Sequence, residues 1–254
     1  MTTSDGRVLT GKTAVVTGAG RGLGAAISVA LAEVGANVVL AARSTEQIAS
    51  VARQVERVGT KSLAITTDVT KSDDIDAMVE AAITQFGRID ILVNNSGVVS
   101  SRELLDTTES EWSRVLDTNL GGVFLATRAV GKHLVAQGSG KVVNIASNFA
   151  IRGIARHAAY GASKAAVVAF TKCMAVEWAR HNVQVNGLAP GYFSTDLNAA
   201  VRGDPAMMER ILRAVPARRM GDASELAPWV VLLSSSASDF MTGETIVIDG
   251  GQSI

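Results

Sequence analysis

Short apolar runs rich in valine and isoleucine recur along the whole chain. They occupy residues 13–17, 37–41, 62–66, 90–94, 141–145, 183–187 and 245–249. Each run shows little alternation of polar and apolar positions, which is typical of strands in a parallel sheet that is covered on both faces. The pattern predicts seven strands in one sheet.

Segments with the helical spacing of apolar residues separate these runs, for example residues 24–35 and 73–87. Repeated strand–helix–strand units predict right-handed crossovers and an α/β fold with a doubly wound parallel sheet. No linker, low-complexity tract or repeat interrupts the series, so residues 1–254 are interpreted as a single domain.

Residues 190–221 depart from this rhythm and hold three of the four prolines. A long connection inside a compact domain often forms a lid or a binding segment. We therefore predict a substrate loop or lid here, with a helical excursion on the surface as the alternative.

Charge and composition narrow the classes of partner. The chain has 254 residues, 24 basic and 24 acidic side chains, and no basic run longer than Arg218-Arg219. This balance argues against nucleic acid or an anionic membrane as the main partner and favours a small-molecule substrate. Residues 1–12 lack the apolar core of a signal peptide, and no apolar run reaches the roughly 18 residues of a spanning helix, so we expect a cytoplasmic protein.

The single cysteine, Cys173, lies in an apolar helical pattern and is interpreted as a core residue. One cysteine excludes a disulfide framework within the chain. Because His133, His157 and His181 are widely separated, the sequence also predicts no metal site. The chemistry has to come from other side chains.

A glycine-rich segment, TGAGRGLGAA at residues 17–26, follows the first predicted strand and opens the first predicted helix. Gly18, Gly22 and Gly24 give the pattern Thr-Gly-x-x-x-Gly-x-Gly. Glycines at such a turn let the backbone approach a pyrophosphate, whose charge then lies at the helix N-terminus. The segment predicts a dinucleotide site; an ordinary structural turn is the alternative, since glycine-rich turns are common.

The end of the second predicted strand indicates which dinucleotide is favoured. A carboxylate there would accept hydrogen bonds from the 2′-hydroxyl of NAD, whereas an arginine accommodates the 2′-phosphate of NADP. Here Ala41 and Ala42 are followed by Arg43, and Arg21 adds a second positive charge from the glycine turn. We predict NADP(H); if Arg43 is instead a solvated residue at a helix start, NAD(H) binds as well.

Further motifs follow one another along the chain. They are Thr17-Gly18-x-x-x-Gly22-x-Gly24, Asp68-Val69, Asn94-Asn95-Ser96-Gly97, Asn119, Ser147, Tyr160-x-x-x-Lys164, Asn186 and Pro190-Gly191. With these motifs the chain resembles the short-chain dehydrogenase/reductase family over nearly its whole length, although Ser96 replaces the alanine usual in the family. The resemblance implies a single-domain Rossmann fold with a seven-stranded parallel sheet, and an NAD(P)-dependent oxidoreductase that interconverts a secondary alcohol and a ketone.

The resemblance assigns catalysis to four residues, Asn119, Ser147, Tyr160 and Lys164. Tyr160 would be the general acid in reduction. Lys164, one helical turn on and on the same face, would lower the pKa of Tyr160 by its charge and bind the nicotinamide ribose. Ser147 would donate a hydrogen bond to the substrate oxygen, and Asn119 would hold a water that passes protons from Lys164. Taken alone, Ser147 fits a strand-end cap and Asn119 a helix residue bonded to the backbone.

The same resemblance implies cofactor contacts along the chain. Asp68 would meet the adenine, Asn94 the adenosine ribose or the backbone around it, and Thr195 the nicotinamide carboxamide. Asn186 would brace the active site through hydrogen bonds. The full predicted cofactor set is Gly18, Arg21, Gly22, Leu23, Gly24, Arg43, Asp68, Val69, Asn95, Gly97, Tyr160, Lys164, Pro190, Gly191 and Thr195.

Residues 174–197, with the element APGYF, resemble the branch of the family that contains gluconate 5-dehydrogenases and related sugar-acid enzymes. Arg152, Arg156 and His157 are candidates for pairing with a substrate carboxylate, although exposed arginines are equally typical of surface loops. Tyr192 is a fourth candidate for substrate contact.

Two other functions stay open. A 3-oxoacyl-(acyl-carrier-protein) or coenzyme A reductase would offer basic side chains to its acidic carrier, but residues 136–141 and 179–182, where such charge usually lies, supply little. A catalytically silent nucleotide-binding regulator would have no need of all four catalytic residues. Because the family commonly forms tetramers, the resemblance also implies a homotetramer.

Overall fold

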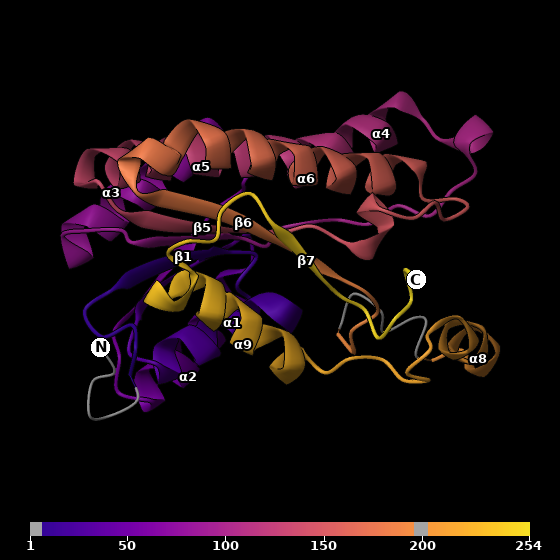
Figure 1. Ribbon diagram of the computed structural model, residues 1–254, viewed down its shortest axis with the longest axis horizontal. Coiled ribbons are helices and arrows are strands. Elements are labelled where there is room, and N and C mark those ends of the chain that lie inside the picture. Colours follow the sequence, from indigo (N-terminus) through magenta and orange to yellow (C-terminus); the bar gives the residue numbers. More distant parts are fainter. Residues whose placement is uncertain (1–6, 196–202) are drawn as a thin grey trace.

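Seven parallel strands form a single sheet in the computed structural model, which describes residues 7–195 and 203–254 (Figure 1). The strands are β1 (Thr13–Thr17), β2 (Asn37–Ala42), β3 (Ser62–Thr66), β4 (Ile91–Asn94), β5 (Gly140–Ile145), β6 (Val183–Pro190) and β7 (Thr245–Ile248). Their order across the sheet is β3-β2-β1-β4-β5-β6-β7. The predicted fold class and the seven predicted strands are confirmed.

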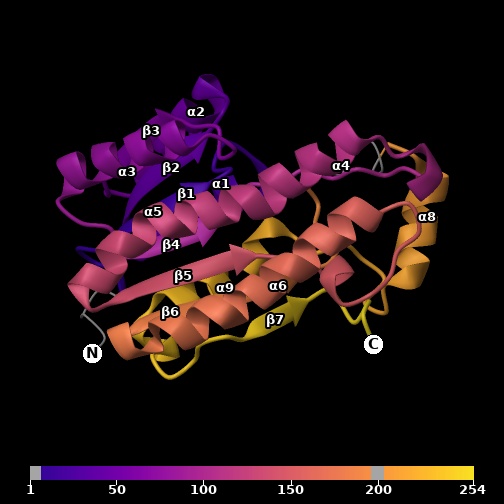
Figure 2. The same ribbon diagram turned by 90° about the horizontal axis from the view of Figure 1, so that it is seen from above.

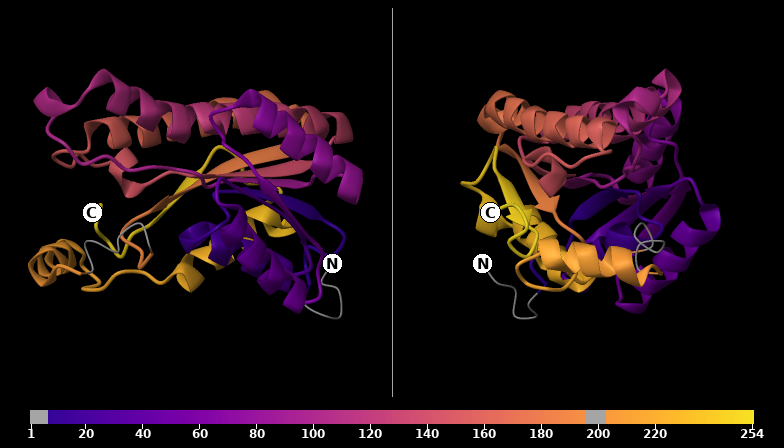
Figure 3. Two further views of the ribbon diagram at one scale, coloured as in Figure 1. Left: turned by 180° about the vertical axis from the view of Figure 1, so that it is seen from behind. Right: turned by 90° about the vertical axis from the view of Figure 1, so that its right-hand side faces the viewer.

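Helices cover both faces of this sheet (Figures 2 and 3). The structure places them at α1 (Gly22–Glu33), α2 (Thr45–Arg57), α3 (Ser72–Phe86), α4 (Glu109–Leu116), α5 (Gly122–Gln137), α6 (Ala158–Trp178), α8 (Pro205–Ala214) and α9 (Ala223–Ser234). α1, α2 and α9 pack on one face, and α3, α5 and α6 pack on the other. The described residues therefore form three layers, as a doubly wound sheet requires.

The central strand β1 shows how the sheet is buried. Ala14 and Val16 belong to the core beneath α1, α2 and α9, whereas Val15 belongs to the core beneath α3 and α5. This alternation follows from the two-residue period of a strand. The prediction of strands covered on both faces is wrong for the edge strands β3 and β7, which are only partly buried; Val247 in β7 is 40% exposed.

The strand order reverses between β1 and β4. From β1 the chain proceeds to β2 and β3 on one side, and β4 then begins the series on the other side. Such a switch point leaves a crevice beyond the carboxyl ends of the two strands, and open α/β sheets bind their ligands there. The glycine turn follows β1, and the segment Asn95–Gly97 follows β4, so both lie at this crevice.

The segment 190–221 leaves the sheet and returns to it. The N–H of Gly221 donates to the carbonyl of Tyr192 (2.9 Å), and the N–H of Ser194 donates to the carbonyl of Gly221 (2.8 Å). These bonds join the two ends of the segment, with α8 between them. Residues 196–202 of the predicted lid lie outside the described residues, and its action as a lid stays a prediction.

Helix α6 corrects one prediction. Cys173 is exposed, not buried in the core, because the buried residues of this turn are Thr171 and Ala175 and position 173 falls on another face. Val176 is 83% exposed on the same helix, so its apolar composition does not mark its buried side. Among the helices of the described residues, none is long and apolar enough to cross a membrane.

Candidate active site

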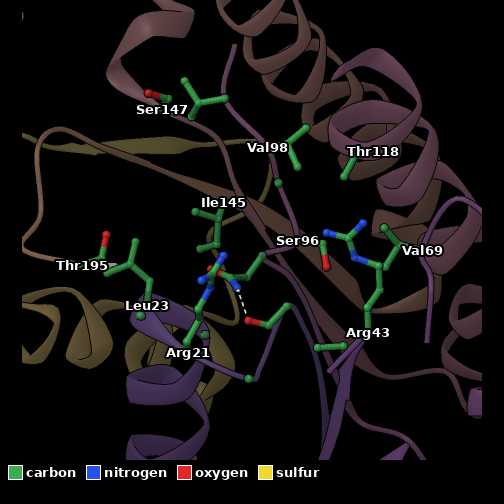
Figure 4. A pocket seen from close by; sticks show the side chains of 18 of the residues that line it. Arg21, Leu23, Arg43, Val69, Ser96, Val98, Thr118, Ile145, Ser147 and Thr195 are labelled. Carbon is green, nitrogen blue, oxygen red and sulfur yellow. Dashed lines mark hydrogen bonds between the residues drawn. The ribbon is translucent and has the colours of Figure 1, made fainter. Parts of the chain in front are cut away.

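A cavity of about 640 Å³ opens beyond the carboxyl ends of β1, β4 and β5 (Figure 4). Every residue of the predicted cofactor set lines it, from Gly18 in the first turn to Thr195 after β6. Ser147, Tyr160 and Lys164 line it as well. Residues distributed over most of the chain therefore meet in one place, as the motifs predict.

The glycine turn closes tightly against the end of β4. A Cβ atom on Gly24 would lie 2.1 Å from the carbonyl oxygen of Gly18, so only glycine fits there. Asn95 Nδ2 donates to the carbonyls of Thr17 (3.0 Å) and Gly18 (3.2 Å). The hydroxyl of Thr17 accepts from the N–H groups of Asn95 (3.0 Å) and Ser96 (3.1 Å). These bonds fix the turn in the shape that the cavity requires.

The N-terminus of α1 faces this cavity without a side-chain cap. Arg21 stands at the N-cap position and makes no capping hydrogen bond, and the first turn holds no acidic residue. The first N–H groups of a helix need acceptors and carry a partial positive charge. This end of the cavity is therefore suited to a phosphate group.

Arg43 and Asp68 both line the end of the cavity beside β2. Partial burial of Asp68 on its own would raise the pKa of its carboxyl, but the N–H (3.1 Å) and hydroxyl (2.8 Å) of Thr70 bind it and Arg43 and Lys71 lie nearby. The net effect lowers the pKa of Asp68, which is an anion at neutral pH. Arg43 is exposed and follows directly on β2, where the strand supplies no carboxylate.

Tyr160 and Lys164 lie on one face of α6, beside the end of β5. Lys164 Nζ donates to the carbonyl of Ile145 (2.8 Å) and lies 5.9 Å from the ring centroid of Tyr160. Lys164 is buried, and burial lowers its pKa to about 8. The ammonium is thus the main form at neutral pH, but it can lose its proton near that range.

The predicted lowering of the Tyr160 pKa by Lys164 is wrong for this arrangement. Burial raises the pKa of Tyr160, and it outweighs the hydrogen bond with Ser147, which acts in the opposite direction. Tyr160 is therefore protonated at neutral pH, as the proton donor in the reduction of a ketone has to be. Ser147 Oγ accepts from the N–H of Phe149 (3.2 Å), so its own proton is directed toward other acceptors.

Asn119 lies behind the cavity rather than in its lining. It belongs to a π-helical turn, Asp117–Gly121, between α4 and α5. Its Oδ1 accepts from Val98 N (2.8 Å), and its Nδ2 donates to Val98 O (3.0 Å) and Ser163 Oγ (3.0 Å). A Cβ on Gly97 would lie 3.4 Å from Asn119 Oδ1 and 3.5 Å from Lys164 Nζ, so the three residues meet. The predicted water at Asn119 stays a prediction.

The predicted substrate residues do not line the large cavity. Arg156 pairs with Glu103 at 3.7 Å on the surface, where both side chains are exposed. Arg152 donates to the carbonyl of Gln252. Arg152 and His157 line a second cavity of about 400 Å³ between the loop after β5 and α6. None of these contacts points to the substrate, and the predicted roles stay predictions.

Phe149 is a site residue that the sequence did not indicate. Its ring makes edge-on contacts with Tyr160 (5.8 Å), Tyr192 (6.1 Å) and His157 (5.2 Å) between ring centroids. Phe149 therefore links Tyr160 and Tyr192 to the second cavity, whose lining it joins together with His157. Its position two residues after Ser147 is the one feature of the sequence that could have indicated this role.

Two predicted side chains point elsewhere. Asn94 Nδ2 donates to Thr127 Oγ1 (2.9 Å) and Asn144 Oδ1 (2.8 Å) in the core between α5 and β5, so its predicted contact with a ribose is wrong for the side chain. Asn186 binds Met241 O (2.7 Å) and Glu244 N (3.1 Å). These bonds tie β6 to the connection before β7, and Asn186 does not line the cavity, so its bracing of the active site stays a prediction.

Comparison with known proteins extends the likeness to the whole chain. The family model for enoyl-(acyl carrier protein) reductase matches residues 18–253. A 2-dehydro-3-deoxy-D-gluconate 5-dehydrogenase from Escherichia coli (strain K12) is 42% identical over 246 residues, which are 96% of this chain and 96% of that protein. A 3-oxoacyl-(acyl-carrier-protein) reductase from Staphylococcus epidermidis is 36% identical over 94% of this chain and 98% of its own length.

Among solved structures, a gluconate 5-dehydrogenase from Burkholderia cenocepacia J2315 in complex with NADP and tartrate matches this fold with a TM-score of 0.93. It is 38% identical, and the match covers 98% of this chain and 97% of that chain. The likeness therefore includes every element that carries the cavity.

Proposed function

Because the chain belongs to the short-chain dehydrogenase/reductase family of oxidoreductases, we propose that it interconverts a secondary alcohol and a ketone with NADP(H), on a sugar acid. The observation that carries the proposal is the shared cavity, in which the complete predicted cofactor set meets Ser147, Tyr160 and Lys164. Sugar-acid dehydrogenases among the relatives support the substrate class.

The cofactor supplies or accepts the hydride, and the residues of this chain orient the substrate and move the proton. In the reductive direction Ser147 donates a hydrogen bond to the carbonyl oxygen, which stabilises the negative charge that develops there. Tyr160 then donates its proton to that oxygen. Lys164 lies beside Tyr160, so its charge offsets part of the cost of the phenolate left behind, although burial keeps the pKa of Tyr160 above its ordinary value. Asn119, which contacts the backbone next to Gly97, keeps this end of the site in place.

NADP(H) is preferred over NAD(H) in this proposal because Arg43 stands at the end of β2 and Arg21 at the start of α1, both in the lining of the cavity. The NADP bound to the gluconate 5-dehydrogenase from Burkholderia cenocepacia agrees with this choice. Dissociation constants of NADPH and NADH measured by fluorescence test it, and tighter binding of NADH would contradict it.

The substrate is tested by an activity screen with NADPH against keto sugar acids, 3-oxoacyl thioesters, cyclic ketones and steroids. We expect turnover of keto sugar acids. Preference for 3-oxoacyl thioesters would favour the second candidate, a 3-oxoacyl reductase, which the relative from Staphylococcus epidermidis represents. Binding of NADPH without turnover of any ketone would favour a regulator.

We also propose a cytoplasmic homotetramer in which segment 190–221 closes over the substrate. Val176 and Cys173 on α6 are exposed, and so is Phe124 on α5 at 44%. Exposed apolar side chains that gather into a patch are typical of a protein–protein interface. Analytical ultracentrifugation at micromolar concentration checks the assembly, and a monomeric mass would contradict it.

A further inference from the structure

The last turn before the end of the chain, residues 249–252, contacts three segments of the site; it is called the C-terminal turn below. The carboxylate of Asp249 fixes this turn internally, since its Oδ1 accepts from Gly251 N (3.0 Å) and Gln252 N (3.1 Å). Asp249 also packs on the segment after β6: a Cβ on Gly191 would lie 2.6 Å from Asp249 Cβ. The C-terminal turn therefore abuts one residue of the predicted nicotinamide contact.

Its second contact is with the segment that carries Ser147. Asn148, the next residue, is 1% exposed, and its Nδ2 donates to Gln252 Oε1 (2.7 Å) and Asp249 Oδ2 (3.2 Å). Arg152 adds a bond to the carbonyl of Gln252. The helical turn that follows Ser147, Asn148–Ala150, is thus attached to the C-terminal turn by its first residue and by Arg152, two residues beyond its last.

Its third contact is with the segment that leads out of α8. Ala217 N donates to the carbonyl of Gly250 (3.0 Å). A Cβ on Gly250 would lie 2.9 Å from Val215 Cγ1, and one on Gly251 would lie 3.1 Å from Pro216 Cγ. Both glycines have positive φ angles, 65° and 85°. In Figure 1 the yellow chain end accordingly lies between the loop before α6 and the α8 region.

We propose that the C-terminal turn is a positioning element that holds Ser147, the segment after β6 and the base of α8 as one unit, with Asn148 and Asp249 as its positioning residues. The proposal rests on the proposed function, because it concerns the placement of Ser147 for hydride transfer. A displacement of a reacting group by about 1 Å can cost roughly 10²-fold in rate. Loss of the side-chain pair that holds Ser147 in place should therefore lower kcat.

A reciprocal exchange of the two side chains tests the pair. Asn148→Asp places a carboxylate against Asp249, and Asp249→Asn places one amide N–H₂ group against another. The double variant restores one acceptor facing one donor, since the amide at position 249 can donate to the carboxylate at position 148 while its oxygen still accepts from the turn. The amide of Gln252 can rotate to donate as well.

The measurements are kcat and KM for the best ketone of the activity screen, the dissociation constant of NADPH, and the melting temperature. We expect kcat to fall about tenfold or more in each single variant, the NADPH constant to stay within about twofold, and the double variant to recover most of kcat. Val55→Ala is the control, because it opens a cavity in the core under α2 and Val55 lines neither of the two cavities. It should lower the melting temperature and leave kcat unchanged.

Amide hydrogen exchange with bound NADPH gives a second readout that needs no turnover. Exchange should rise in both single variants over residues 148–152 and 215–217, and it should return toward the wild type in the double variant. If the screen finds no substrate, the proposed function fails. The exchange measurement alone then tests whether the C-terminal turn holds these segments together. Unchanged exchange in these two segments would overturn the inference. Single variants with a lower melting temperature but the wild-type kcat would overturn it as well.

Discussion

The pyrophosphate end of the cavity is built from backbone, whereas the catalytic end is built from side chains that distant segments hold in place. At the first end, Gly18, Gly22 and Gly24 shape the turn within a few residues of sequence, and Asn95 secures it. At the second end, Ser147 depends on its neighbour Asn148, which is bound by residues about 100 positions away. A local motif specifies most of the first end, to which the fold adds Asn95, and only the completed fold specifies the second.

The largest expected effect concerns the catalytic end. Tyr160→Phe removes the proton donor but keeps the ring that packs against Phe149, so we expect kcat to fall by about 10²–10⁴-fold. The NADPH dissociation constant should change little, because only the hydroxyl of Tyr160 is lost and the other predicted cofactor contacts are untouched. Stopped-flow and steady-state rates of NADPH oxidation measure the loss, and a rate near that of the wild type would remove Tyr160 from the mechanism.

The pyrophosphate end should respond in the opposite way. Gly24→Ala forces a Cβ into contact with the Gly18 carbonyl, and overpacking of this kind costs about 1–3 kcal/mol. We expect NADPH binding to weaken by roughly 10–100-fold, as measured by fluorescence titration. Gly87→Ala is the matched control, because Gly87 lies at the C-terminus of α3 with open space around its Cβ position. An alanine at its φ of 76° should lower the stability of the protein but leave the NADPH affinity unchanged.

These two ends also differ in how far the sequence predicted them. The strand pattern located the sheet, because the apolar runs of a buried parallel strand are local, and the glycine turn located the cavity for the same reason. Phe149 and the C-terminal turn were missed, since their contacts join segments that are far apart in sequence. Cys173 was misplaced because α6 is apolar on several faces, so composition alone did not identify the buried one.

A pKa is also a property of the folded environment. The sequence predicted that the charge of Lys164 lowers the pKa of Tyr160, and spacing on the helix did place the two side chains together. Burial was not visible in the sequence, and it raises the pKa of Tyr160 and lowers that of Lys164. The residue pair was predictable, but the balance between desolvation and charge was not.

A smaller effect tests the adenosine side of the cavity. Arg43→Ala removes the exposed guanidinium that would bind the 2′-phosphate, and we expect the ratio of NADH to NADPH dissociation constants to fall about tenfold. NADH binding itself should stay nearly constant. Arg53→Ala on the exposed side of α2 is the control for a general loss of positive charge. Equal weakening of both dinucleotides in Arg43→Ala would argue against a 2′-phosphate contact.

The smallest expected effect is on stability and comes from the catalytic end. Lys164 has a pKa of about 8 in the folded protein and about 10.4 in the unfolded chain. Above pH 8 the folded state therefore loses its proton first, the unfolded state binds more protons, and stability rises with pH. Between pH 8 and 9.5 we expect a gain of roughly 1–2 kcal/mol from this group.

Lys164→Met removes the titrating group and should remove that rise. Urea unfolding at fixed protein concentration, with wild type and variant compared at each pH, isolates the contribution of Lys164 from those of other groups. The raised pKa of Tyr160 acts in the opposite direction, because the folded state keeps that proton longer than the unfolded state, but its effect begins only near pH 10. If both proteins gain stability equally between pH 8 and 9.5, the burial of Lys164 does not cause the rise in stability. The pKa of Lys164 in the folded protein would then lie above this range.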